Sequence, residues 1–292
     1  METEASKDAS GAPASAIKPA CGCGGKTAAE TNTGAAAYPF VYAIGKVEPR
    51  FPRVDIEKEF RQAVGRAGTA GQTDNEAFHT VLSQRENRYL ARKLCWMFTI
   101  QGMEAYILQP RDSADYDLLL ACIRPTPGPG DMDAVIGVRG PTAPPEMCGG
   151  VPLPILFFDQ LYSFSRETLI GAIPKPAKNG MDRFKPAAEA VFDRVMQMTD
   201  NAGAADEHRA LNYLAMRYPA IYSTAAEAFA SNCSLSAVDI RPSRLSGPRR
   251  IVDAIFSFTH RDTDVVDKYF ARVDVSEEFP FLVTKMSPYY DR

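Results

Sequence analysis

The sequence predicts an α+β fold with a mixed or antiparallel sheet, a central block of helices and a C-terminal β-meander. Strand-like apolar runs recur up to Tyr162, and residues 181–229 carry apolar side chains at helical spacing. From Cys233 onward the apolar residues recur with a period of two, as they do in half-buried strands. Strands that lie on both sides of a helical block are typical of α+β proteins.

The elements of the first half are predicted from periodicity and from turn residues. Thr73 and Glu76 fit a capping box at the start of a helix that should bury Phe78, Val81 and Leu82. A glycine between two apolar runs near residue 102 predicts a hairpin. Strands are expected over 39–44, where Gly45 ends the first strand, and over 94–100, 104–108, 134–138 and 154–162; helices are expected over 55–64, from 74 onward and over 84–93.

The second half is predicted from one long helix and a change of period. The helix over 181–199 is the best supported, because apolar side chains recur on one of its faces. Two more helices are expected over 207–217 and 221–229. The polar run 259–263 has turn chemistry, so the strands around it should form an antiparallel meander. The stripe of the long helix comprises Phe184, Ala188, Val191, Phe192, Val195 and Met196, and the strands are expected over 236–241, 251–258, 265–275 and 281–284.

The domain organisation follows from composition. Residues 1–37 are mostly Ala, Gly, Ser, Thr and Glu, which bury too little apolar surface to offset their ordering entropy. We therefore expect a flexible tail over 1–37 and a single folded domain over 38–292. A run rich in proline and glycine at 125–130 is a second candidate boundary, between two lobes of that domain.

Composition and charge exclude several classes of protein. The 292 residues carry a formal net charge of −3, whereas proteins that bind nucleic acid usually have a basic excess. The N-terminus is acidic and lacks the apolar core of a secretory signal. The longest apolar runs are too short to span a bilayer. We therefore expect a cytoplasmic protein that binds neither nucleic acid nor membrane.

The cysteines predict a structural zinc site. Cys21 and Cys23 form a Cys-x-Cys pair between glycines in the expected tail, where cysteine has no use in packing. Cys148 and Cys233 lie among turn residues from which a thiolate could reach the same metal ion. The other two cysteines, Cys95 and Cys122, lie in apolar runs and are expected as core thiols. The alternative is that the tail cysteines are idle and the others only pack.

Two arginine clusters are candidates for binding an acidic peptide segment. Arg85, Arg88 and Arg92 would share one helix face, because they are spaced by three and four residues. Guanidinium groups suit carboxylates and peptide carbonyls, although both clusters are also typical of solvated surface. The second cluster lies in the expected loop between strands and comprises Arg241, Arg244, Arg249 and Arg250.

The sequence contains no recognisable catalytic motif. Only three histidines are present, His79, His208 and His260, and none lies in a hydrolase or metalloprotease signature. A triad is recognised by its geometry, so one assembled in space remains open. On this ground we lean towards a protein that is not an enzyme.

Several segments resemble one known family: Tyr42–Gly45, Glu48–Pro52, Ser83–Asp112, Val135–Cys148, Asp206–Ile221 and Glu277–Arg292. They are similar to the C-terminal domain of unknown function of cyanobactin maturation proteins of the PatG and PatA type. The resemblance extends from about Cys21 to the last residue. PatG-type proteins also carry a subtilisin-like macrocyclase, and no such protease domain is present here.

The resemblance implies an accessory, non-catalytic role in the biosynthesis of ribosomally made, modified peptides. The expected partner is a precursor peptide, a maturation protease or a modifying enzyme. Two alternatives stay open: an enzyme of the same pathway that uses the metal to modify the peptide, and a module that forms a homodimer or docks a partner protein.

Overall fold

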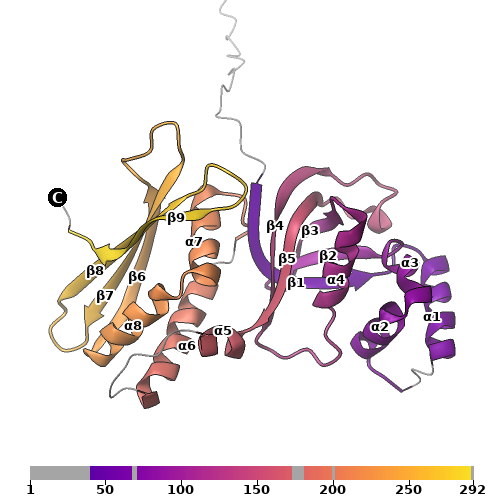
Figure 1. Ribbon diagram of the computed structural model, residues 1–292, viewed down its shortest axis with the longest axis horizontal. Coiled ribbons are helices and arrows are strands. Elements are labelled where there is room, and N and C mark those ends of the chain that lie inside the picture. The colour runs from indigo at the N-terminus through magenta and orange to yellow at the C-terminus, as the bar shows by residue number, and fades with distance from the viewer. Residues whose placement is uncertain (1–39, 68–70, 173–180, 199–200, 291–292) are drawn as a thin grey trace, which may run out of the picture. The chain divides into compact units, whose positions relative to one another are not determined.

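The computed structural model describes residues 40–67, 71–172, 181–198 and 201–290. These residues belong to one compact unit of the chain. Its architecture is α+β, as the sequence predicts: a barrel, a block of helices and a four-stranded antiparallel sheet (Figure 1). None of the described helices combines the length and the apolar character needed to cross a bilayer.

The barrel is built from the strands of the first half. The expected mixed sheet is present and closes on itself in the order β1-β2-β3-β5-β4. All its neighbours are antiparallel except β3 and β5, which run parallel. Closure removes the free strand edges of this sheet. The strands are β1 (Phe40–Arg50), β2 (Cys95–Ile100), β3 (Met103–Pro110), β4 (Asp131–Thr142) and β5 (Pro154–Ser165).

The first strand continues through Gly45, so the prediction that it ends there is wrong. Residues 40–45 of β1 pair with β4, and residues 46–50 pair with β2. Gly45 therefore lies where the strand changes partner. A Cβ atom at this position would lie 2.2 Å from the carbonyl oxygen of Thr99 on β2. This glycine serves a close approach of two strands rather than a turn.

Helices cover one part of the barrel. They are α1 (Val54–Ala67), α2 (Asp74–Ser83), α3 (Arg88–Ala91) and α4 (Tyr116–Cys122). The capping box is confirmed: Thr73 N donates to Glu76 Oε2 over 2.9 Å, and Glu76 N donates to Thr73 Oγ1 over 3.3 Å. The predicted core positions of α2 are also confirmed as buried: Phe78, Val81 and Leu82.

The prediction of one continuous helix over 84–93 is wrong. Gln84 is extended, a 3-10 turn covers Arg85–Asn87, and α3 is only one turn long. The buried Asn87 donates from Nδ2 to Gln84 Oε1 over 2.9 Å, and this local bond competes with helical geometry. The three arginines of this segment therefore do not share a face of one continuous helix.

The loop at 125–130 does not separate two lobes. It connects α4 to β4, and β4 pairs with β1, which precedes the loop in the chain. Asp131 closes the loop, since its Oδ2 accepts a hydrogen bond from Gly128 N over 2.6 Å and its Oδ1 lies 2.8 Å from Arg124 Nη1. Both sides of the loop thus belong to the same barrel.

The helical block is followed by the predicted meander, with strand order β6-β7-β8-β9. The stripe on α6 is confirmed at Phe184, Ala188, Val191 and Phe192, which are buried. The helices are α5 (Arg166–Ala172), α6 (Met181–Met198), α7 (Asp206–Arg217) and α8 (Ala220–Ala230); the strands are β6 (Cys233–Pro242), β7 (Ile251–His260), β8 (Val266–Asp274) and β9 (Phe281–Pro288).

One hydrophobic cluster links the barrel to the meander through the helices. It contains Tyr42 and Ile44 of β1, the apolar faces of α6–α8, and Phe256 and Val273 of the meander. The barrel has a second cluster of its own, which includes Trp96 and Phe98. Packing on the shared cluster uses one face of the meander and leaves the other for the surface.

Candidate functional site

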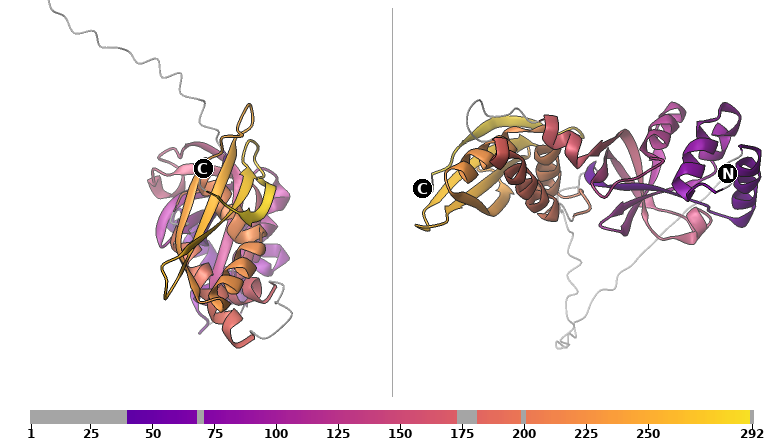
Figure 2. Two further views of the ribbon diagram at one scale, coloured as in Figure 1. Left: turned by 90° about the vertical axis from the view of Figure 1, so that its left-hand side faces the viewer. Right: turned by 90° about the horizontal axis from the view of Figure 1, so that it is seen from below.

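The candidate site is the face of the meander that points away from the helices, which we call the outer face. Residues opposite each other in antiparallel strands share a face, and successive residues alternate between faces. Val252 and Val273, which are paired, lie in the core against the helices, so Asp253 and its partner Arg272 lie on the outer face. The left view of Figure 2 shows this sheet towards the viewer, with the helices behind it.

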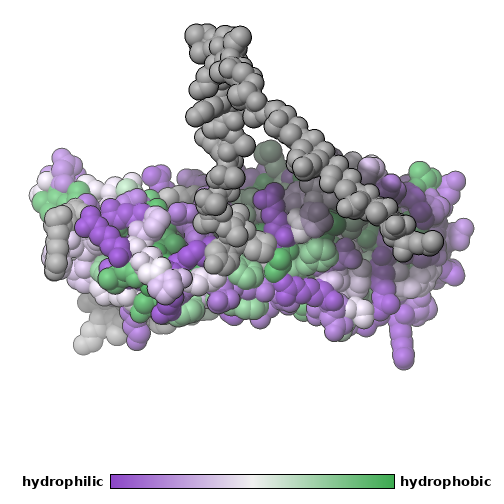
Figure 3. Space-filling model, turned by 90° about the horizontal axis from the view of Figure 1, so that it is seen from above, coloured by the Kyte–Doolittle hydropathy of each residue, from purple (hydrophilic) through white to green (hydrophobic). Residues whose placement is uncertain are grey.

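Exposed apolar area alone does not mark a site on the face of the molecule drawn in Figure 3. On the face drawn in Figure 3, hydrophobic residues are scattered among hydrophilic ones where the described residues are visible. The outer face combines guanidinium groups that lie over aromatic rings with an open strand edge.

Three arginine–aromatic pairs line the outer face. The guanidinium carbon of Arg241 lies 5.5 Å from the ring centroid of Tyr289, that of Arg272 lies 4.7 Å from Phe270, and that of Arg249 lies 5.2 Å from Phe281. Two of the rings, Phe270 and Tyr289, also meet edge to face with centroids 5.7 Å apart. Such contacts attract each guanidinium group to the face of a ring and restrict its position.

Two carboxylates anchor these arginines from the sheet side. Asp253 Oδ1 accepts from Arg272 Nε over 2.8 Å, and buried Asp274 accepts from Arg249 Nε. Burial opposes ionisation of Asp274, but hydrogen bonds from Ser276 and Arg249 outweigh it and lower the pKa of the carboxyl. Each contact uses only part of a guanidinium group, which has five N–H donors. The side chains of Arg249 and Arg241 remain 51% and 47% exposed.

The last strand adds an open edge to this surface. β9 is at the end of the strand order and pairs with β8 alone within the sheet. Phe281 and Val283 on β9 are 46% and 41% exposed. One backbone amide, Met286 N, is bonded to the hydroxyl of Tyr218 over 2.7 Å. An edge strand with exposed apolar side chains is a template for pairing with another extended segment.

The structure separates the two predicted arginine clusters. Arg241 and Arg249 both lie on the outer face, each over a different ring, and Arg244 is exposed in the loop between β6 and β7. Arg85 and Arg88 lie in the helical segment beside the barrel, where Arg88 pairs with Asp117 at 3.2 Å. Peptide binding by any of these arginines stays a prediction.

Arg250 stabilises the fold rather than the candidate site. Its Nη1 donates to Asp206 Oδ1 over 2.6 Å, and its Nη2 donates to the carbonyl oxygen of Val275 over 2.9 Å. The sequence cluster therefore contains residues with different roles.

The sequence reasoning missed the aromatic residues of the outer face. Phe270, Phe281 and Tyr289 read as ordinary positions of half-buried strands. The spacing of Phe270 and Arg272, two residues apart on one strand, is the local signal that could have found the first pair. The partners of the other two pairs are distant in sequence, so no local pattern indicates them.

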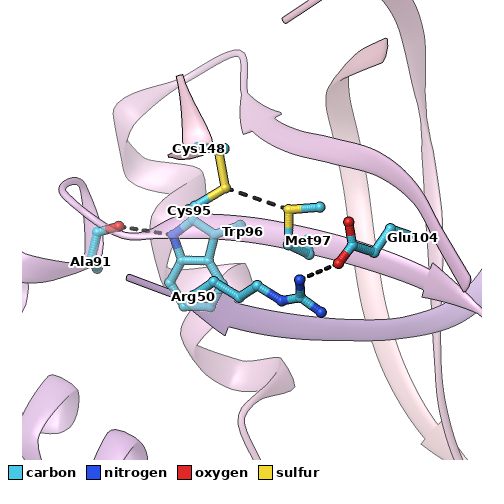
Figure 4. The surroundings of a disulfide bond; sticks show 7 residues. All are labelled: Arg50, Ala91, Cys95, Trp96, Met97, Glu104 and Cys148. Atoms are coloured by element: carbon cyan, nitrogen blue, oxygen red, sulfur yellow. Dashed lines mark hydrogen bonds and ion pairs between the residues drawn. A yellow bond between two sulfur atoms is a disulfide. The ribbon is translucent and has the colours of Figure 1, made fainter. Parts of the chain in front are cut away.

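A disulfide corrects the predicted zinc ligands. Cys148 is bonded to Cys95, with their Cα atoms 5.4 Å apart (Figure 4). A sulfur atom in a disulfide is not available as a thiolate, so the prediction of Cys148 as a zinc ligand is wrong. The prediction of Cys95 as a free thiol in the core is wrong for the same reason. Positive φ angles at Cys148, Gly149 and Gly150 bend the loop back on itself at the disulfide.

The remaining cysteines leave the zinc prediction open. Cys233 is buried, and its thiol donates to the carbonyl oxygen of Ser231 over 3.6 Å. Cys21 and Cys23 lie outside the described residues. Within the described ranges, no group of three or more histidine, cysteine or acidic side chains is arranged to hold a metal ion. Zinc binding by the tail pair stays a prediction, which the metal content of a Cys23→Ser variant would test.

The structure describes the environments of two of the histidines. His260 Nδ1 accepts a hydrogen bond from the backbone N of Asp262 over 3.3 Å, as turn residues do. Burial lowers the pKa of His208, although Glu207 opposes the shift.

Comparison with known proteins finds a family model that resembles the part of the chain with the outer face. Residues 178–289 match the family model described as PatG C-terminal. This segment is similar to PatG C-terminal regions. It contains α6–α8 and all four strands of the meander, so the outer face belongs to it. The expected resemblance is thus confirmed, although the sequence match is shorter than the segment from Cys21 onward that we expected.

The fold likeness extends beyond residues 178–289. A solved structure described as "PatG Domain of Unknown Function" is similar to this chain with a TM-score of 0.68 and 17% sequence identity. The match covers 86% of this chain and 99% of that chain, so it includes the barrel as well as the meander. At this identity the likeness shows the shared fold alone. No curated protein matches the chain.

Proposed function

We propose that this chain is a non-catalytic accessory protein of ribosomal peptide biosynthesis of the cyanobactin type, and that its outer face binds an extended segment of a precursor peptide. The observation that carries the proposal is the pair of exposed arginines, Arg249 and Arg241, that lie over the rings of Phe281 on β9 and of Tyr289 just after it, together with the unpaired edge of β9. The similarity to PatG proteins supports the pathway, and the chemistry of the surface supports the ligand.

The geometry of β9 favours a peptide in extended conformation. A strand added at a sheet edge gains main-chain hydrogen bonds, and its alternate side chains meet the face of the sheet. Here those side chains would meet the exposed Phe281 and Val283. Apolar residues at alternate positions of the peptide would therefore bury apolar area on β9.

The charges of the outer face favour acidic residues in the same peptide. Arg241 and Arg249 are restricted by contact with a ring and keep free N–H donors, so a carboxylate can bind with less ordering of a flexible side chain. Lys285 on β9 is exposed and adds a further positive charge. The preferred ligand thus alternates apolar and acidic residues. Because a precursor peptide is flexible, binding should be weak.

The proposal is tested by titrating the protein into a fluorescein-labelled synthetic peptide that alternates valine or phenylalanine with glutamate. We expect saturable fluorescence polarisation, and we expect Phe281→Ser and Arg241→Glu each to weaken binding several-fold. The matched controls are Val265→Ser, an exposed apolar residue in the turn between β7 and β8, and Arg85→Glu, an exposed arginine of the other cluster. Equal losses in the outer-face variants and the controls would contradict the proposal.

A further inference from the structure

Two carboxyl groups from distant parts of the chain meet between the barrel and the meander. Asp159 lies on β5, and Glu278 lies in the connection from β8 to β9. Both carboxyl groups contact the guanidinium group of Arg111, and Asp159 is close enough to raise the pKa of Glu278. Asp159 has no partner in the strand register, because Ile136 pairs with Gln160 and Gly137 pairs with Phe158. This β-bulge redirects the Asp159 side chain, as bulges commonly do.

One guanidinium group contacts both acids of the pair. Arg111 contacts both, with Nη1 2.6 Å from Asp159 Oδ2 and Nη2 3.5 Å from Glu278 Oε1. Both of these carboxyl oxygens are buried, and neither accepts a hydrogen bond of good geometry from the described residues. One guanidinium group therefore faces two acids, and two neighbouring carboxyl groups repel each other less when one of them holds a proton.

The other charges nearby are already paired. Buried Arg209 donates from Nη2 to the backbone oxygen of Glu278 over 3.1 Å, and its Nη1 lies 3.7 Å from Asp206. Asp206 in turn pairs with Arg250. The side chain of Glu277, the neighbouring acid, is exposed. Arg209 thus offsets only part of the charge of the pair.

These surroundings determine how tightly the pair holds its proton. Burial and the neighbouring carboxyl group of Asp159 raise the pKa of Glu278 to about 7, while Arg111 and Arg209 oppose the shift. The proton would therefore be exchanged close to neutral pH.

We propose that Asp159 and Glu278 share one proton and form a latch that fastens the β8–β9 connection, and with it the start of β9, to the barrel. This inference goes beyond the proposed function and does not rest on it. The latch is closed when one carboxyl group is protonated. When the proton is lost, two carboxylates face a single guanidinium group and repel each other.

Opening of the latch should be local. Arg209 still donates to the backbone oxygens of Glu277 and Glu278, so the connection keeps its main-chain anchor. The residues that gain freedom are those next to Glu278, including Phe279, which is already exposed. These residues lead directly into β9. A change in pH that opens the latch should therefore make the start of this edge strand less ordered.

The test is hydrogen exchange measured by mass spectrometry on the full chain, one pH unit below and one above about 7. After correction for the intrinsic pH dependence of exchange, residues 276–283 of the wild type should lose protection at the higher pH. Glu278→Gln should keep that protection, because an amide donates to Asp159 at any pH. Asp159→Asn should do the same from the other side, and it replaces Glu278→Gln if that variant does not fold.

Glu277→Gln is the matched control, because it removes an exposed carboxylate from the same connection. It should behave as the wild type does. The proposal is overturned if exchange over 276–283 is independent of pH in the wild type, or if the pH dependence persists in both Glu278→Gln and Asp159→Asn.

Discussion

The two sheets of this protein differ in whether every strand has a neighbouring strand on both sides. The barrel closes, so each of its strands has two neighbours and no edge is free. The meander stays open, with the helices on one face and the surface on the other. A closed sheet needs no protection against pairing with other chains, whereas an open one does. The comparison identifies the open meander as the part of the fold on which the proposed peptide binding depends.

The open sheet protects its two edges unequally. β6 carries exposed Asp239, Arg241 and Pro242, all of which disfavour an added strand. β9 instead exposes Phe281 and Val283. The difference is expected if β9 is the edge that receives a ligand.

The largest expected effect is the loss of Arg209, which joins the two regions. This buried guanidinium binds three backbone oxygens of the β8–β9 connection and lies over the ring of Phe40 on β1. Burial lowers its pKa to about 10, so it is still charged at neutral pH. Arg209→Leu should reduce the free energy of unfolding by roughly 3–5 kcal/mol in chemical denaturation, since it breaks a buried ionic contact.

The exposed Arg244 is the control for that variant. Arg244→Leu should change the free energy of unfolding by no more than about 0.5 kcal/mol. Similar losses for the two substitutions would show that Arg209 does not connect the barrel to the meander.

The second largest effect is expected from the disulfide bond, which lies in the barrel region. The disulfide between Cys95 and Cys148 closes a loop with a sequence separation of 53. Its removal in Cys148→Ala should reduce stability by about 2–4 kcal/mol, because the unfolded chain is no longer constrained. Denaturation with and without a dithiol reductant checks this. The reductant should destabilise the wild type and leave the variant unchanged; a wild type that is insensitive to it would contradict the disulfide.

Substitution of Gly45 tests the close approach of β1 and β2 in the barrel. A methyl group at Gly45 would meet the backbone of β2, so Gly45→Ala should cost about 1–3 kcal/mol through overpacking. Gly65 in α1 has no atom within 4 Å of such a methyl group, so Gly65→Ala should stabilise the protein by roughly 0.5–1 kcal/mol. Thermal unfolding of both variants compares them directly, and a shift of equal sign would argue against the close approach of β1 and β2.

The pH dependence of stability gives a smaller effect. The pKa of Glu278 rises from 4.5 to about 7 on folding, so the folded state keeps a proton that the unfolded chain releases. Stability from this group is complete below 4.5 and is lost as the pH rises through about 7. Urea titrations across this window should show a decline that is weaker in Glu278→Gln. The same decline in wild type and variant would assign it to another group.

The sequence predicts local features of this fold and not its long-range contacts. The capping box at Thr73, the stripe of α6 and the period of two in the meander follow from neighbouring residues, and all three are confirmed. Barrel closure depends on the parallel pairing of β3 with β5, two strands that are distant in the chain. No periodicity reports such a pairing.

The candidate site was predictable only in part for the same reason. Arginines that are close in sequence are visible as a cluster, so Arg241 and Arg249 could be found. Their aromatic partners and the pair of Asp159 with Glu278 are brought together only by folding. The disulfide was missed because Cys95 reads as one apolar residue in a buried strand.

The most direct test of the central claim is a hydrogen-exchange footprint of the full chain with and without the alternating valine–glutamate peptide. If the open sheet receives the ligand, protection should increase over residues 281–288, which form β9, and stay unchanged over the barrel strands. Protection that appears in the segment around Arg85 and Arg88, or protection nowhere in the meander at a peptide concentration that saturates binding, would contradict the account.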